Sequence, residues 1–160
     1  MLIWSWIKYT QIVLIILVVS ITLSCNKEID CEQSTQSWVK MGFYTVTDQK
    51  VDSAVGLYDV TLYGINIDSL FYNSDDNVYS ISFLLSQLQD SSSYVLQIGT
   101  ISDTLKFEYT RDLRFISTEC GFATSFTINN FETTKHIIDS FQIVNPHVNI
   151  ILIENIKVYF

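Results

Sequence analysis

The sequence predicts an all-β domain, either an antiparallel β-sandwich or a partly open barrel, with about seven to nine strands. Three observations lead to this prediction. β-branched and aromatic residues recur with period-two alternation, helical periodicity is scarce, and turn-forming residues separate the alternating segments at short intervals. Short strands at this spacing are typical of sandwiches and barrels.

The clearest strand covers residues 104–111. Leu105, Phe107 and Tyr109 point to one side of it, whereas Lys106 and its polar neighbours point to the other. This pattern predicts a strand with one solvated face. Similar segments predict strands at residues 38–46, 58–63, 78–84, 94–99, 113–117, 122–128, 147–151 and 156–160.

Polar turn-forming residues predict connections at 73–77, 90–93 and 129–130. Residues 133–140 are ambiguous. Ile137, Ile138 and Phe141 could share one helical face, so a short helix competes there with an extended segment.

The first 24 residues have the profile of a cleaved signal peptide. Lys8 precedes an unbroken aliphatic run at 12–19, which Ile21 and Leu23 extend. A membrane-spanning helix needs roughly 20 apolar residues, and this run is shorter. We therefore expect residues 1–24 to be removed, residues 25–30 to form a short tether and residues 31–160 to form one β domain. An uncleaved anchor or a conventional cleavage site remains the alternative.

Cys25 follows the leader directly and is preceded by the small residue Ser24. This order is typical of a bacterial lipoprotein, whose cysteine is the site of lipid attachment, although Thr22 occupies the place where leucine is usual. We expect Cys25 to carry diacylglycerol and an acylated amino group. The partner of the chain would then be a membrane, held through a lipid anchor that two or more acyl chains make stable.

Charge and cysteine content restrict the partners and the compartment. Lys8 lies in the leader, so residues 25–160 carry 8 of the 9 basic side chains and all 17 acidic ones, a net charge of −9. Such a chain repels phosphate backbones and anionic lipid head groups, and we expect no nucleic-acid binding. With Cys25 occupied by lipid, an exported compartment favours a disulfide between Cys31 and Cys120. Two reduced, buried thiols are the alternative.

The chain resembles a family of small lipoproteins of unknown function from Bacteroidetes. The resemblance is strongest at residues 103–109 and 115–122, which include the sequence Cys120-Gly121-Phe122, and extends to an early cysteine like Cys31 and a strand-like terminus like residues 156–160. It implies an envelope location, with the outer membrane favoured and its periplasmic and surface faces both open. It implies no activity and no catalytic residue.

Candidate catalytic residues lack a supporting pattern. His136 and His147 stand eleven residues apart with no second ligand at metal-site spacing, and no serine lies in a Gly-x-Ser-x-Gly motif. The adjacent acids Asp75 and Asp76 are typical of a hydrated turn. We therefore expect no enzyme activity, no metal and no cofactor.

Aromatic residues near turns suggest one alternative function. Tyr63, Phe71 and Tyr72 could form an exposed platform of flat rings for a glycan, although core packing explains aromatic residues in a sheet equally well. The first hypothesis is a non-enzymatic, lipid-anchored domain that contacts envelope components. The second is a surface glycan-binding module.

Overall fold

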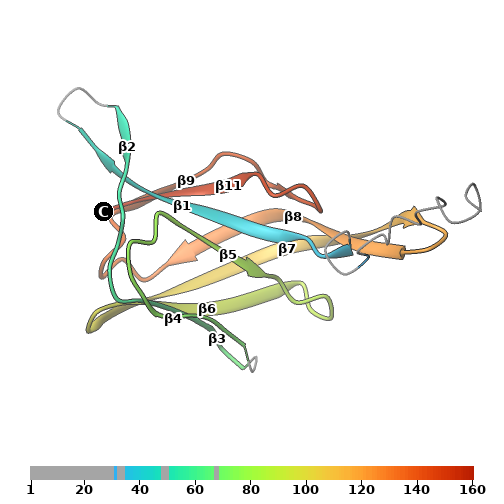
Figure 1. The fold of residues 1–160 in the computed structure, drawn as a ribbon, viewed down its shortest axis with the longest axis horizontal. Coiled ribbons are helices and arrows are strands. Elements are labelled where there is room, and N and C mark those ends of the chain that lie inside the picture. The colour runs from blue at the N-terminus through green and yellow to red at the C-terminus, as the bar shows by residue number, and fades with distance from the viewer. Residues whose placement is uncertain (1–30, 32–34, 48–50, 67–68) are drawn as a thin grey trace, which may run out of the picture. The chain divides into compact units, whose positions relative to one another are not determined.

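The computed structural model describes Cys31 and residues 35–47, 51–66 and 69–160, and Cys31–Phe160 form one compact unit. The described residues confirm the all-β prediction (Figure 1). The strands are β1 (Trp38–Val46), β2 (Asp52–Ala54), β3 (Val60–Gly64), β4 (Leu70–Asp75), β5 (Ser80–Leu84), β6 (Ser91–Ile98), β7 (Ile101–Ser117), β8 (Gly121–Thr133), β9 (Ser140–Ile143), β10 (His147–Val148) and β11 (Glu154–Tyr159).

The strands form two sheets. The first has the order β2–β1–β11–β9, and β5 pairs with β1 on the same side as β2 but nearer the start of that strand. The second has the order β10–β8–β7–β6–β3–β4. All pairings are antiparallel except β1 with β11, which run parallel. The first and last strands of the unit therefore lie side by side in the first sheet.

The core lies between the two sheets, and aromatic rings connect them. The ring of Phe83 on β5 lies 4.7 Å from that of Tyr94 on β6 and 5.4 Å from that of Phe107 on β7, measured between centroids. Alternate residues of β1, which are Val39, Met41 and Phe43, are fully buried. A fully buried side chain of this size contributes about 1.5–3 kcal/mol, so β1 is an integral part of the domain.

Two predicted turns are strand in the structure. β4 runs through most of residues 73–77, and the left-handed backbone of Ser74 and Asn77 marks its irregular end. Residues 129–130 lie inside β8, where the pairing with β7 shifts register and leaves Asn129 as the extra residue of a bulge. Ser74 and Asn129 show that polar residues tolerate local irregularity inside a strand, whereas β4 does end at Asp75, within the predicted turn.

The third predicted turn, at residues 90–93, lies a few residues earlier in the structure. Residues 91–93 begin β6, and the chain bends at 87–90 instead. Ser92 is buried, and its hydroxyl accepts a hydrogen bond from the backbone N–H of Ser86 at 3.0 Å. Here the serine closes the loop from within the strand.

The segment 134–139 is not helical, because a buried carboxylate takes its backbone donors. Asp103 at the start of β7 is fully buried. It accepts hydrogen bonds from the N–H groups of His136, Ile137 and Ile138 at 2.7, 2.8 and 2.9 Å and from the hydroxyl of Thr134 at 2.8 Å. These bonds fix the connection from β8 to β9 and bury Ile138 against the core.

The same contacts set the charge of Asp103. Burial tends to raise the pKa of its carboxyl, but the bonds from the backbone of His136, Ile138 and Ile137 and from Thr134 outweigh burial and hold the pKa below its ordinary value. The ionised form is therefore the one that stabilises the fold.

Replacing this carboxylate should destabilise the protein. Asp103→Ala leaves three backbone donors without their acceptor, and we expect the free energy of unfolding to fall by more than about 3 kcal/mol in urea titrations at pH 7. Asp139→Asn, an exposed acid in the same connection, is the control and should change it by less than about 0.5 kcal/mol. Equal effects of the two changes would show that Asp103 is not the residue that fixes this connection.

The pH dependence follows from the lowered pKa. Since the folded state binds its proton more weakly than the unfolded state, the contribution of Asp103 is complete above the ordinary aspartate pKa of about 3.9 and is lost as the pH falls through the lower folded value. The stability difference between the parent and Asp103→Ala should therefore shrink below about pH 4. A difference that grew with acidification would contradict this account.

Candidate functional site

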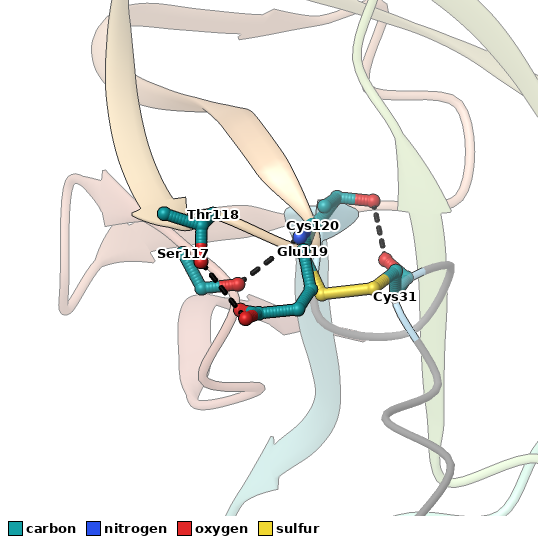
Figure 2. Close-up of a disulfide and its surroundings, with 6 residues drawn as sticks. Cys31, Ser117, Thr118, Glu119 and Cys120 are labelled. Atoms are coloured by element: carbon teal, nitrogen blue, oxygen red, sulfur yellow. Dashed lines mark hydrogen bonds between the residues drawn. A yellow bond between two sulfur atoms is a disulfide. The ribbon is translucent and has the colours of Figure 1, made fainter.

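A disulfide joins the start of the described chain to the turn at the end of β7. Cys31 and Cys120 are bonded, with their Cα atoms 5.1 Å apart and a sequence separation of 89 (Figure 2). This is the pair that the sequence analysis expected. It places Cys31 at the turn between β7 and β8, so the segment that precedes Cys31 enters the domain at this end.

Local contacts shape the turn around Cys120. The backbone N–H of Cys120 donates to the hydroxyl of Ser117 at 3.0 Å, and the hydroxyl of Thr118 donates to the carboxylate of Glu119 at 2.8 Å (Figure 2). This hydroxyl bond, with others from the turn, holds the pKa of Glu119 below its usual range. Gly121 has a φ of +71°, which glycine adopts without steric cost. The turn is thus built to reverse the chain and present the cysteine.

The hairpin of β7 and β8 carries exposed apolar residues near this turn. Phe115 lies opposite Phe122 in the register, with ring centroids 5.5 Å apart, and Leu113 is on the same face two residues earlier. Earlier in β7, Phe107 and Tyr109 lie on the same face and are buried. The apolar face of β7 therefore continues beyond the part of the strand that the core covers.

A second apolar segment lies against the hairpin. The side-chain amide of Asn155 donates to the carbonyls of Asn145 and His147, both at 3.0 Å, and β10 pairs with β8. Asn149 then accepts the backbone N–H of Ile151 at 2.8 Å, an Asx turn that begins the exposed run 150–153. These contacts fix where the run leaves the sheet.

The two segments are contiguous. Phe115, Ile150 and Ile151 line one hollow of about 240 Å³, together with Arg114. We call Leu113, Phe115, Phe122 and residues 150–153 the apolar end. Each of these seven residues exposes between 41% and 65% of its surface. Exposed apolar residues that gather at one end of a domain mark an interaction site more often than apolar residues scattered singly over the surface do.

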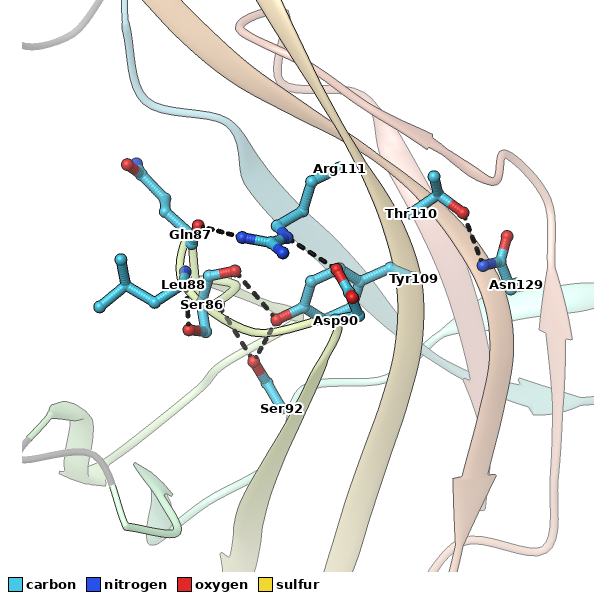
Figure 3. A network of polar contacts seen from close by, with 9 residues as sticks. All are labelled: Ser86, Gln87, Leu88, Asp90, Ser92, Tyr109, Thr110, Arg111 and Asn129. Atoms are coloured by element: carbon cyan, nitrogen blue, oxygen red, sulfur yellow. Dashed lines mark hydrogen bonds and ion pairs between the residues drawn. The ribbon is translucent and has the colours of Figure 1, made fainter.

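A polar network lies farther back on β7 and fastens the loop before β6 (Figure 3). Tyr109 donates its hydroxyl proton to the carbonyl of Ser86 at 3.1 Å and lies 2.6 Å from the hydroxyl of Ser92. Arg111 contacts the carboxylate of Asp90 and the carbonyl of Gln87, both at 2.7 Å. Burial raises the pKa of Tyr109. The groups of this network are used in holding the loop, which is a structural role.

The three residues of the expected glycan platform do not share a surface. Tyr63 is 38% exposed, whereas Phe71 and Tyr72 pack against the core. Phe71 contacts the rings of Phe83 and Tyr94, and the hydroxyl of Tyr72 accepts the backbone N–H of Ser82 at 3.0 Å. Core packing therefore explains Phe71 and Tyr72, but not Tyr63.

The histidines and acids lie apart. His136 contacts Asp103 through its Nδ1 at 3.1 Å, and Nδ1 of His147 lies 3.3 Å from the hydroxyl of Thr127. Asp76 accepts the backbone N–H of Asp59 at 3.0 Å, as expected of a turn acid. Within the ranges that the structure describes, no three histidine, cysteine or acidic residues gather where they could hold a metal ion. Cys25 lies outside the described residues.

No helix among the described residues combines the length and apolar character needed to cross a bilayer.

Comparison with known proteins identifies a family. The model of a family of unknown function, DUF6452, matches residues 59–160, which is more than half of the chain, and the chain therefore belongs to this family. No curated protein and no solved structure shows a significant match. The match begins after β1, yet β1 contributes three fully buried residues to the core. The structural unit is thus larger than the matched region.

The apolar end was missed in the sequence because its parts look ordinary. Leu113 and Phe115 have the alternation of a strand whose face is buried, and their exposure depends on how far the first sheet extends. The signal that could have found the site is the run 150–153, four consecutive apolar residues just before the alternating terminal strand.

Loss of the disulfide should destabilise the domain. In the chain-entropy model a closed loop of about 90 residues contributes roughly 4–5 kcal/mol. We expect the double variant Cys31→Ser, Cys120→Ser to show a loss of that order in urea unfolding followed by circular dichroism. As a control, a reducing agent should lower the unfolding midpoint of the parent and leave that of the double variant unchanged. Unfolding curves of the parent and the double variant that coincide under oxidising conditions would show that the disulfide does not stabilise the domain.

Proposed function

We propose that this protein is a lipid-anchored lipoprotein of the bacterial cell envelope, of the Bacteroidetes type that the sequence resembles, and that its β domain has a non-enzymatic, structural or interaction role. The observation that carries the proposal is Cys25, directly after a short aliphatic leader and Ser24. In this proposal residues 1–24 are removed, lipid is attached to Cys25, and the outer membrane is the anchoring bilayer.

The disulfide supports the compartment. Cys31 and Cys120 are bonded, and structural disulfides persist in exported proteins, whereas cytosolic thiols are kept reduced. An exported protein with a cysteine at the end of its leader is what a lipoprotein requires. The third cysteine, Cys25, is the one that remains for lipid.

The use of the polar residues supports a non-enzymatic role. The buried carboxylate of Asp103 is occupied by backbone donors, and Arg111 is engaged by Asp90 and a carbonyl. Arg111 and Asp90 also line an open hollow of about 480 Å³, but their charges are already paired with each other there. These polar contacts thus serve the fold, and the apolar end is the surface that we expect to make interactions.

The anchor can be tested by substitution. In cells given labelled palmitate, the parent should incorporate label and sediment with the membrane fraction, because two or more acyl chains give stable attachment. Cys25→Ala should abolish both the incorporation of label and the sedimentation with membranes. Ser24→Ala is the matched control, since it keeps a small residue before the cysteine and should leave labelling intact. Membrane association of Cys25→Ala at the level of the parent would refute lipid anchoring through this residue.

A further inference from the structure

We propose that the apolar end, Leu113, Phe115, Phe122 and residues 150–153, docks into the interfacial region of the bilayer that holds the lipid anchor. This inference rests on the proposed function, and it adds an orientation: the domain lies with this end in the membrane surface and does not swing freely on its tether.

The apolar end gathers side chains from two parts of the chain. The β7–β8 hairpin and the loop at 150–153, which follows later in the sequence, bring apolar side chains to the same end, and the rings of Phe115 and Phe122 are in edge-to-face contact. Soluble domains seldom expose four consecutive apolar residues such as 150–153 unless the segment has a binding role. The lipid interface accepts apolar and aromatic side chains of this kind.

The chain enters the Cys31–Phe160 unit beside the apolar end. Five residues separate Cys25 from Cys31, so the two lie within about 20 Å even when the tether is fully extended. Cys31 is bonded to Cys120, two residues before Phe122. A lipid on Cys25 therefore keeps the apolar end, of all parts of the domain, close to the bilayer.

The opposite end of the same strand shows the contrast. Ile101 begins β7 and Ser117 ends it, sixteen residues apart, which corresponds to roughly 50 Å of extended strand. The tether is too short to bring both ends to the membrane unless the domain lies flat. Ile101 is also 55% exposed, so it provides a reference position of similar exposure.

Few charges lie in the described part of the hairpin end. The chain is strongly acidic, but within residues 112–122 Arg114 pairs with Asp112 at 2.9 Å, and Glu119 in the turn adds one further charge. Residues 149–153 carry none. A bilayer surface can cover this end while desolvating few charges, and Arg114 can extend its head group toward water. Lipid is the occupant that the tether brings within reach.

The test measures the depth of each end in a membrane. Phe115→Trp and Ile101→Trp are made in the full chain, isolated in the membrane-bound form and reconstituted into phosphatidylcholine vesicles with and without brominated phosphatidylcholine. The parent supplies the background emission of Trp38, its one tryptophan once residues 1–24 are removed. Bromine quenches indole only at short range, so we expect loss of emission and a blue shift for Phe115→Trp, and neither for Ile101→Trp. Intact mass of the same samples reports whether Cys25 carries lipid.

The outcomes separate the two proposals. If Cys25 carries lipid and neither indole is quenched, the docking inference is wrong and the anchor stands. Equal quenching of both positions would also overturn it, because the apolar end would then have no preference for lipid. A Phe115→Trp indole that is blue-shifted without vesicles and insensitive to bromine would assign this end to a second copy of the chain instead. If the mass shows no lipid on Cys25, the proposed function fails, whatever the quenching result.

Discussion

The disulfide between Cys31 and Cys120 is the constraint on which the arrangement of this domain depends. It attaches the point where the chain enters the unit to the turn of its longest hairpin, 89 residues later. Without it, the start of the unit would have no covalent link to this turn, and the first strand pairing would begin at Trp38. With it, whatever anchors the N-terminal side also anchors the hairpin, so in the proposed function this bond would determine which end of the domain faces the membrane.

β7 shows how one pattern produces two surfaces. Along its first half, Leu105, Phe107 and Tyr109 are buried between the sheets, whereas Leu113 and Phe115 continue the alternation and are exposed. The difference comes from the shorter first sheet, not from the strand. A hairpin that extends beyond its covering sheet keeps its apolar face and presents it at the end of the molecule, next to the disulfide.

The sequence was sufficient for the fold class, for β1 at residues 38–46 and for most other strands, because period-two alternation reports a half-buried sheet directly. It was insufficient where polar residues lie inside a strand, as in β4 and at Asn129. It was also insufficient where a distant side chain determines the backbone conformation, as Asp103 does for residues 134–139. The apolar end could not be predicted because exposure depends on the extent of the other sheet. The alternation of apolar and polar residues also could not distinguish aromatic rings that pack in the core, such as Phe71, from rings on an exposed platform.

In the proposed function, lipid on Cys25 and the disulfide between Cys31 and Cys120 together hold this domain at a membrane. Intact mass spectrometry of the native protein, extracted from membranes without reductant, tests both parts at once. The account predicts a polypeptide of residues 25–160 carrying the added mass of a diacylglycerol and an acyl chain, with no reactive thiol. A chain that retains residues 1–24 and an unmodified Cys25 would contradict it.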